Sequence, residues 1–275
     1  MKFLSGKNSS AEMPFLDHLE ELRWRVLWSV LAITVGSIIG FWLVTRFAVL
    51  ELLIDPIQPY LRPMTVTGPN GTAVMTDERL GYLSPMDPFF VTLKLAITVG
   101  VLLAFPIVAY QIWSFVSPAL HKREKKAIVP ALYLGLVLFL AGVALAYFVV
   151  LPMTFQFADR FQTESLRQQI VIGPYMAMVT KVLLAFGLVF ELPVVVMVLS
   201  ALGLISSKFL AEKRRFAIAG AAVLAALLSP GDAVTVTIFM MGPIILLYEM
   251  SIGIARLMER RRRKALMAEP MTEAL

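Results

Sequence analysis

The hydrophobic pattern of this chain consists of long apolar runs separated by polar segments. About 20 apolar residues form a helix that crosses a hydrocarbon core of about 30 Å, so runs of this length predict membrane-spanning helices. Six spans are predicted, at residues 24–45, 88–110, 127–149, 175–199, 216–229 and 233–254. The last two are short or interrupted. They predict a helical hairpin that is too short for a full bilayer, which would thin or tilt around it.

The polar segments around these spans set the predicted domain organisation. Residues 1–13 form a polar N-terminal segment without the apolar core of a removable signal peptide, residues 14–256 form a six-helix transmembrane domain, and residues 257–275 form a basic tail. The loop 47–87 is rich in proline, so we expect little long regular structure there, apart from a short interfacial helix at 48–54. The predicted fold class is an all-α integral membrane protein.

A second helical pattern precedes the first span. Phe15, Leu19 and Leu22 recur at helical spacing and form an apolar stripe, while Glu21 and Arg25 lie four residues apart on the opposite side. The pattern predicts a short amphipathic helix at the membrane surface that presents carboxylates to water. It also fits a plain ion pair between Glu21 and Arg25, worth about 0.2–0.5 kcal/mol.

Composition supports the membrane assignment and excludes several kinds of chemistry. Of all residues 59% are hydrophobic and 16% are charged, whereas soluble domains carry about 25% charged residues. There is no cysteine, which excludes disulfides and thiolate metal sites, and the chain has only two histidines, His18 and His121. The Walker A, GxGxxG, HExxH and GxSxG patterns do not occur. We therefore expect no enzyme activity, no metal and no cofactor.

The net charge of +6 is distributed as membrane topology requires. Eighteen Lys and Arg residues lie at positions 2–25, in the loops after spans two and four, and at positions 256–264, against five on the other side. By the positive-inside rule, both termini and the two short basic loops are cytoplasmic. This distribution explains the positive charge without a nucleic-acid partner.

Glu191 lies deep in the apolar run 175–199. A carboxylate at the centre of a bilayer costs about 2.5–3.5 kcal/mol, so its side chain is expected to face protein or water. It is either a functional group or a partner in an internal hydrogen bond that fixes packing. Lys181, ten residues earlier, lies about 15 Å away along the helix, too far for direct pairing.

Polar and aromatic residues in the loops have two interpretations each. Glu124 is the one acid in the basic loop 121–126, and it is either a binding group or a solvated charge screened by its neighbours. Asp232, in the turn before the last span, is a candidate functional acid but also suits a helix N-cap. Trp113 and Phe115 suit anchors in the aromatic belt of a membrane protein.

Five motifs in one order along the chain resemble the TatC family, the core subunit of the twin-arginine protein translocase. They are HLEELR at 18–23, QIWSFVSPALHKREKK at 111–126, AYFVVLP at 146–152, FELP at 190–193 and SPGD at 229–232. Each motif is weak alone, but the resemblance extends over about residues 15–256.

The resemblance implies a concave six-span bundle in the cytoplasmic (inner) membrane of the cell. Such a protein is the receptor for twin-arginine signal peptides of folded cargo. It assembles with TatA-type and TatB-type single-span subunits, with other copies of itself and with the lipid bilayer, and transport uses the proton-motive force.

The resemblance also assigns residues. The signal-peptide-binding positions of the family correspond to Glu21, Glu124, Arg23 and Phe115.

Other family positions correspond to Glu191 within the membrane, and to Pro56 and Asp232 on the periplasmic side. Some relatives carry a glutamine after the final turn, in the region that contacts partner helices. Here Thr235 and Thr237 are the candidates for that role.

The chemistry agrees with these assignments, because two adjacent arginines of a ligand need two carboxylates, which planar guanidinium groups bind in bidentate pairs. Two alternatives stay open at this stage. One is a secondary transporter that uses Glu191 as its ion site, and the other is a membrane scaffold without a receptor role.

Overall fold

The computed structural model describes residues 15–61, 64–67, 73–76, 80–116, 128–160, 170–229 and 234–268. Nearly all of these residues are helical. The long elements are α1 (Phe15–Arg46), α3 (Asp87–Val116), α4 (Ile128–Leu145), α6 (Ile172–Val189), α7 (Leu192–Ala201), α9 (Arg214–Leu228) and α10 (Val234–Ala268). The short elements are α2 (Val49–Ile54), the 3₁₀ helix η1 (Asp55–Tyr60), the π-helical turn η4 (Ala146–Val150), α5 (Leu151–Arg160) and α8 (Ser207–Glu212).

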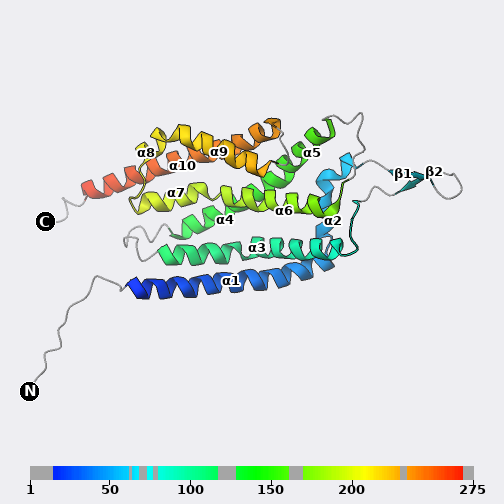
Figure 1. The fold of residues 1–275 in the computed structure, drawn as a ribbon. Coiled ribbons are helices and arrows are strands. Elements are labelled where there is room, and N and C mark those ends of the chain that lie inside the picture. Colours follow the sequence, from blue (N-terminus) through cyan, green and yellow to red (C-terminus); the bar gives the residue numbers. More distant parts are fainter. Residues whose placement is uncertain are drawn as a thin grey trace, which may run out of the picture.

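The long helices lie roughly side by side in one elongated bundle (Figure 1). Helix α1 begins and α10 ends at the same end of the bundle, which we call the termini end. At the opposite end, the hairpin end, strands β1 (Met64–Thr67) and β2 (Ala73–Thr76) pair antiparallel and project away from the helices (Figure 1).

Among the described residues, five helical segments are long and apolar enough to cross a membrane. They are Leu19–Arg46, Asp87–Val116, Pro130–Asp159, Ile172–Ala201 and Val236–Arg260. The predicted fifth span is also a helix, α9, but its 15 residues rise only about 22 Å. Six spans and their orientation therefore stay predictions.

Several predicted boundaries differ from the structure. The surface helix expected at 15–25 is not a separate element, because no proline or turn residue divides it from the first span, and α1 runs unbroken from Phe15 to Arg46. The expected tail at 257–275 is helical as far as Ala268, since its Arg-rich run consists of good helix formers. Loop 47–87 contains the expected short helix, as α2, but also the unexpected β1–β2 hairpin.

The predicted fourth span is helical but interrupted. Helix α6 ends at Val189 and α7 begins at Leu192, with Phe190 and Glu191 in a turn between them. Pro193 has no N–H to donate to the carbonyl of Val189, so the α-helical ladder loses a hydrogen bond at this turn. Pro106 and Pro243, in contrast, lie inside continuous helices.

Glycines bring neighbouring helices into close contact. A Cβ added to Gly36 of α1 would lie 2.6 Å from the carbonyl oxygen of Gly100 in α3, and one added to Gly142 of α4 would lie 2.6 Å from that of Phe186 in α6. The rings of Phe105 and Phe139 stack 3.6 Å apart between α3 and α4. Small residues thus allow the backbones to approach, as is usual between membrane helices.

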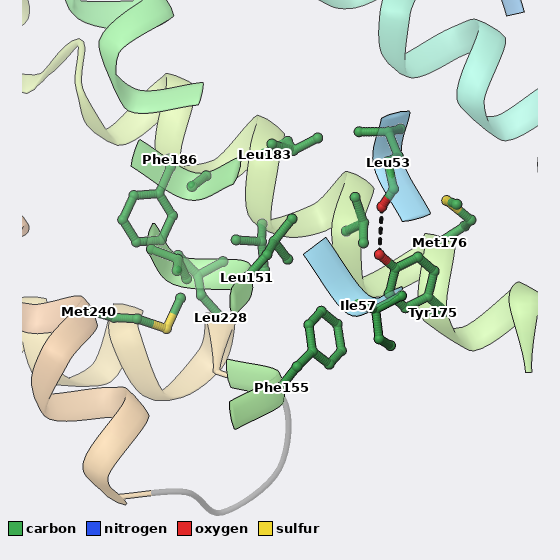
Figure 2. Close-up of a cluster of buried hydrophobic side chains, with 14 of the residues drawn as sticks. Leu53, Ile57, Leu151, Phe155, Tyr175, Met176, Leu183, Phe186, Leu228 and Met240 are labelled. Atoms are coloured by element: carbon green, nitrogen blue, oxygen red, sulfur yellow. Dashed lines mark hydrogen bonds between the residues drawn. The ribbon is translucent and has the colours of Figure 1, made fainter. Parts of the chain in front are cut away.

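The largest apolar core lies towards the hairpin end, where α2 and η1 fold back over the bundle (Figure 2). Ile57 of η1 is fully buried in it. The hydroxyl of Tyr175 donates to the carbonyl oxygen of Leu53 at 2.5 Å, and that of Tyr147 to Leu52 at 2.6 Å. These tyrosines satisfy carbonyls at the C-terminal end of α2, which have no partner within their own helix.

Candidate functional site

Glu21 lies near the start of α1, at the termini end of the bundle. Its carboxylate oxygen Oε1 accepts a hydrogen bond of 3.0 Å from Nε of Arg25 and a second, shorter one from the guanidinium nitrogen NH2 of the same arginine. The two side chains are 27% and 21% exposed. The predicted i,i+4 ion pair is therefore confirmed, and it holds the carboxylate of Glu21 at a partly solvated edge of the bundle.

The packing of α1 against α3 places Glu21 and Phe115 at the same level along the long axis of the bundle. The two helices run antiparallel, and Gly36 contacts Gly100. Glu21 lies fifteen residues before Gly36, and Phe115 lies fifteen residues after Gly100. Both positions are helical, so they lie level with each other at the termini end. Arg23, two residues after Glu21 on the same helix, is exposed.

The two aromatic residues predicted as membrane-belt anchors differ in their surroundings. Trp113 is only 8% exposed and packs in a small core with Ala131 of α4 and Val194 of α7. The prediction of an interfacial anchor is wrong for Trp113, because the helices around α3 cover its ring. Phe115 is half-buried in the last turn of α3.

Several predicted site residues fall partly or wholly outside the described part of the chain. Glu124 and Asp232 lie outside the described residues. Thr235 lies in the first turn of α10, and the half-buried Thr237 follows in the next turn. Pro56 is half-buried near the start of η1, beside the fully buried Ile57.

Glu191 occupies the turn that separates α6 from α7. Its backbone N–H donates to the carbonyl of Leu188 at 3.1 Å, and its own carbonyl accepts from Val194 and Val195. The carboxylate faces Gly135 of α4, where an added Cβ would lie 3.0 Å from Oε2 and 3.4 Å from Oε1. Among the described residues no group donates a hydrogen bond to the buried Oε1.

The surroundings of Glu191 match one expectation from the sequence, because its carboxylate faces another helix. The other expectation was an internal hydrogen bond that fixes packing. The buried Oε1 accepts no such bond within the described part of the chain. Lys181 does not pair with it either, since Lys181 Nζ donates to the carbonyl oxygen of Leu227 at 2.5 Å, at the end of α9.

Two polar contacts on the opposite side of the bundle were not predicted. Arg214 of α9 and Glu249 of α10 form an ion pair of 2.7 Å. Glu259 of α10 accepts hydrogen bonds of 2.6 Å from both the N–H and the hydroxyl of Ser207 in α8. The two residues lie 35 positions apart in the first contact and 52 in the second, so local spacing in the sequence gives no signal for either contact.

The described residues contain no group of three His, Asp or Glu side chains that is arranged to hold a metal ion. The described residues offer instead the arginine-binding carboxylate of Glu21 at the termini end, and the carboxylate of Glu191, whose Oε1 accepts no hydrogen bond from any of them. Both carboxylates can bind cationic or polar groups.

Comparisons with known proteins agree on one family. A family model described as "Sec-independent protein translocase protein (TatC)" matches residues 17–243. The Sec-independent protein translocase protein TatC of Carboxydothermus hydrogenoformans is 38% identical over 244 residues, which cover 89% of this chain and 93% of that protein. The protein of the same name from Aquifex aeolicus is 34% identical, over 92% of this chain and 98% of its own length.

A solved structure shares the fold as well. A crystal structure of the twin-arginine translocase receptor TatC superposes with a TM-score of 0.73 at 35% sequence identity. The match covers 88% of this chain and 99% of that one.

Proposed function

The chain belongs to the TatC family of Sec-independent protein translocase components, and we propose that it is the receptor that binds twin-arginine signal peptides of folded proteins. The family assignment makes it a component of a protein transport system. A similar protein of solved structure is described as the twin-arginine translocase receptor. The alternative of a small-solute transporter built on Glu191 is not retained, because the relatives are named for protein translocation.

We infer that the signal peptide binds at the termini end. Glu21 and Glu124 receive the two arginines, and Arg23 and Phe115 complete the site. The observation that carries this proposal is the position of Glu21, whose carboxylate already binds a guanidinium, that of Arg25, at a partly solvated edge. An arginine of the ligand would take the place of the Arg25 guanidinium on the carboxylate of Glu21. The level position of Phe115 on the neighbouring helix supports an aromatic contact beside it.

The topology belongs to the same proposal. The chain crosses the inner membrane six times, with α9 as the short fifth span, and residues 14–256 form the transmembrane domain. The N-terminal segment 1–13 and the tail 257–275 are cytoplasmic, as the excess of Lys and Arg on that side indicates. The termini end of the bundle, with Glu21, therefore faces the cytoplasm, where folded cargo is made.

Partner subunits are assigned to the last two spans and to the hairpin end of the bundle. Single-span TatA-type and TatB-type subunits dock at spans five and six and at the periplasmic side, near Pro56, Asp232, Thr235 and Thr237. Other copies of the chain join the same complex, which the proton-motive force drives. Glu191 contacts the signal peptide, a partner helix or lipid through its carboxylate, whose Oε1 accepts no hydrogen bond from the described residues.

The experiment that tests the receptor role is crosslinking of a twin-arginine signal peptide to the full chain in membranes. The wild-type chain should capture the twin-Arg peptide and not a Lys-Lys version, because lysine lacks the planar fork of arginine. Glu21→Ala and Glu124→Ala should each lower the yield. Glu51→Ala, an exposed acid at the hairpin end, is the matched control.

Undiminished crosslinking in both variants would contradict the site. The adjacent Glu20 is exposed and is tested alongside as Glu20→Ala, since it can share the role of Glu21. Transport at full rate in Glu191→Ala would remove Glu191 from the mechanism without affecting the assignment of the peptide site.

A further inference from the structure

A lysine of α6 holds the end of α9. Lys181 Nζ donates to the carbonyl oxygen of Leu227 at 2.5 Å. Leu227 lies in the last turn of α9, where the final carbonyls have no partner within their own helix. A cation at this position also faces the negative end of the helix dipole. The contact therefore gives the end of α9 both a hydrogen-bond donor and a compensating charge.

This contact lies near the edge of the hydrocarbon core of a membrane. Helices α6 and α7 form one candidate span, Ile172–Ala201, of 30 residues. A core of about 30 Å takes up about 20 residues of helix, so a core centred on this span begins near position 177. Lys181 begins about 6 Å inside that edge, and a lysine stem can carry its ammonium back over a similar distance. The end of α9 therefore lies at the edge of the core or below it, where its carbonyls meet little water.

The core between α6 and α9 is apolar. Ala225 and Leu228 of α9 belong to the same buried core as Val179 and Val182 of α6. Apolar contacts hold two helices together, but they are non-directional, so one helix can shift along the other at little cost. A hydrogen bond from one donor to one carbonyl does not tolerate such a shift. Among the described residues, Lys181 makes the one hydrogen bond between α6 and α9.

The other polar contact of α9 acts within the α9–α10 pair. Arg214, at the start of α9, forms an ion pair of 2.7 Å with Glu249 of α10. It joins two helices that follow each other in the chain, so it fixes them to each other and not to the bundle. The bond from Lys181 differs, because α6 belongs to a full-length candidate span.

We propose that Lys181 is a positioning residue that sets the height of the α9–α10 pair in the membrane. It acts through the carbonyl of Leu227 and fixes the short α9 against a helix that spans the bilayer. A charged side chain in a spanning helix costs free energy, and for that reason it marks a functional position by default. One consequence rests on the proposed function: the same contact sets the level at which single-span subunits dock to spans five and six.

The test measures depth by spin labelling of the full chain in lipid bilayers. The chain has no cysteine, so one nitroxide can be attached at Leu227→Cys or, one turn earlier, at Val223→Cys. These side chains are 66% and 70% exposed, and neither substitution removes the carbonyl of Leu227. Collision rates with oxygen and with a water-soluble nickel chelate report the depth of each label. With Lys181 in place, the Val223 label should lie within the hydrocarbon core and the Leu227 label about 6 Å nearer its edge.

Lys181→Met keeps the apolar stem and removes the donors. Both labels should then move towards water by up to about 5 Å, one helical turn, because the freed carbonyls are hydrated only nearer the membrane surface. Lys181→Arg supplies a charged donor again and should restore the original depths. Lys94→Met is the matched control, because Lys94 is an exposed lysine in α3, and it should leave both depths unchanged.

A shift of the Leu227 label alone would mean that only the last turn of α9 unwinds, and it would overturn the proposal. Unchanged depths in Lys181→Met, or a failure of Lys181→Arg to restore them, would overturn it too. The chain with Lys181 in place gives a second test if Lys181→Met does not fold, since a Leu227 label in the aqueous phase would contradict the proposed height.

Partner docking is measured separately, by disulfide crosslinking of a cysteine series in a TatA-type subunit to the same two cysteines. In Lys181→Met the strongest crosslink should move by about three or four positions along the subunit, one helical turn. An unchanged position would overturn the link between Lys181 and docking. No crosslink in the presence of Lys181 would contradict the docking site of the proposed function, whereas the label depths in the chain alone would still test Lys181.

Discussion

Gly36 of α1 and Gly100 of α3 contact each other through their backbones, and a Cβ on Gly36 would lie 2.6 Å from the carbonyl oxygen of Gly100. Helix α1 lies at the edge of the bundle and packs mainly on α3 (Figure 1). The glycine contact therefore fixes the position of α1 and, through the register of the two helices, the position of Glu21 beside the end of α3.

Gly36→Ala should destabilise the protein. The added methyl group collides with backbone and forces α1 away from α3, and overpacking of this kind costs about 1–3 kcal/mol. Unfolding in detergent micelles followed by circular dichroism measures the effect. Gly253→Ala, in an open helical position, should instead leave stability unchanged or raise it by up to about 1 kcal/mol. Equal behaviour of the two variants would show that the glycine contact does not hold α1.

Tyr175→Phe should loosen the segment that contains Pro56. Leu53 is a buried residue, 7% exposed. The variant leaves its carbonyl oxygen without the hydroxyl of Tyr175, which donates to it at 2.5 Å. An orphaned buried acceptor costs about 1–3 kcal/mol. Hydrogen exchange of the amides of residues 49–60 should become faster.

Tyr133→Phe is the control for this substitution, because Tyr133 is 71% exposed. If exchange at 49–60 is as slow in Tyr175→Phe as in Tyr133→Phe, the hydroxyl of Tyr175 does not anchor α2 and η1.

Arg25→Gln should raise the affinity for a twin-arginine peptide. In the proposed site the guanidinium of Arg25 occupies the carboxylate that a ligand arginine needs. A partly exposed ion pair contributes about 0.2–1 kcal/mol, so its removal should strengthen binding by up to about fivefold. Peptide titration monitored by fluorescence anisotropy measures the dissociation constant.

Arg46→Gln changes the same charge at the other end of α1 and should leave the affinity unaltered. Weaker binding in Arg25→Gln would mean that Arg25 supports the ligand rather than competes with it.

Glu259→Gln should release α8 from α10. The carboxylate of Glu259 accepts two hydrogen bonds of 2.6 Å from Ser207, and hydrogen bonds to a charged group contribute about 1.5–3 kcal/mol each. Amide exchange and tryptic cleavage at residues 207–213 should both accelerate. Glu212→Gln, at a side chain that is 61% exposed, is the control, and equal cleavage of the two variants would contradict an anchoring role for Glu259.

Some features of the site were predictable because they depend on neighbouring residues. The ion pair of Glu21 and Arg25 follows from their spacing of four on one helix. Pro193 is also a local signal for an interruption near Glu191, although we predicted a continuous span there. The Gly36–Gly40 pair is a GxxxG motif within an apolar run, and it could have predicted the close contact of α1 with another helix.

Other features had no local signal. The sequence does not show that Gly135 lies opposite Glu191, or that Trp113 is covered by α4 and α7, because both depend on which helices become neighbours. The contact of Lys181 with Leu227 joins residues 46 positions apart, and nothing in the composition of α6 or α9 predicts it.

The amino-acid sequence alone determined that this is a helical membrane protein, where its apolar helices lie along the chain, and which family it resembles. Those properties depend on local hydrophobicity, local hydrogen bonding and short motifs, each of which is written in consecutive residues. Tertiary structure decided that Oε1 of Glu191 has no donor among the described residues, and where Phe115 stands relative to Glu21. Between apolar helices in a membrane, packing of small residues rather than hydrophobicity selects the neighbours, so these relationships exist only once the helices have packed.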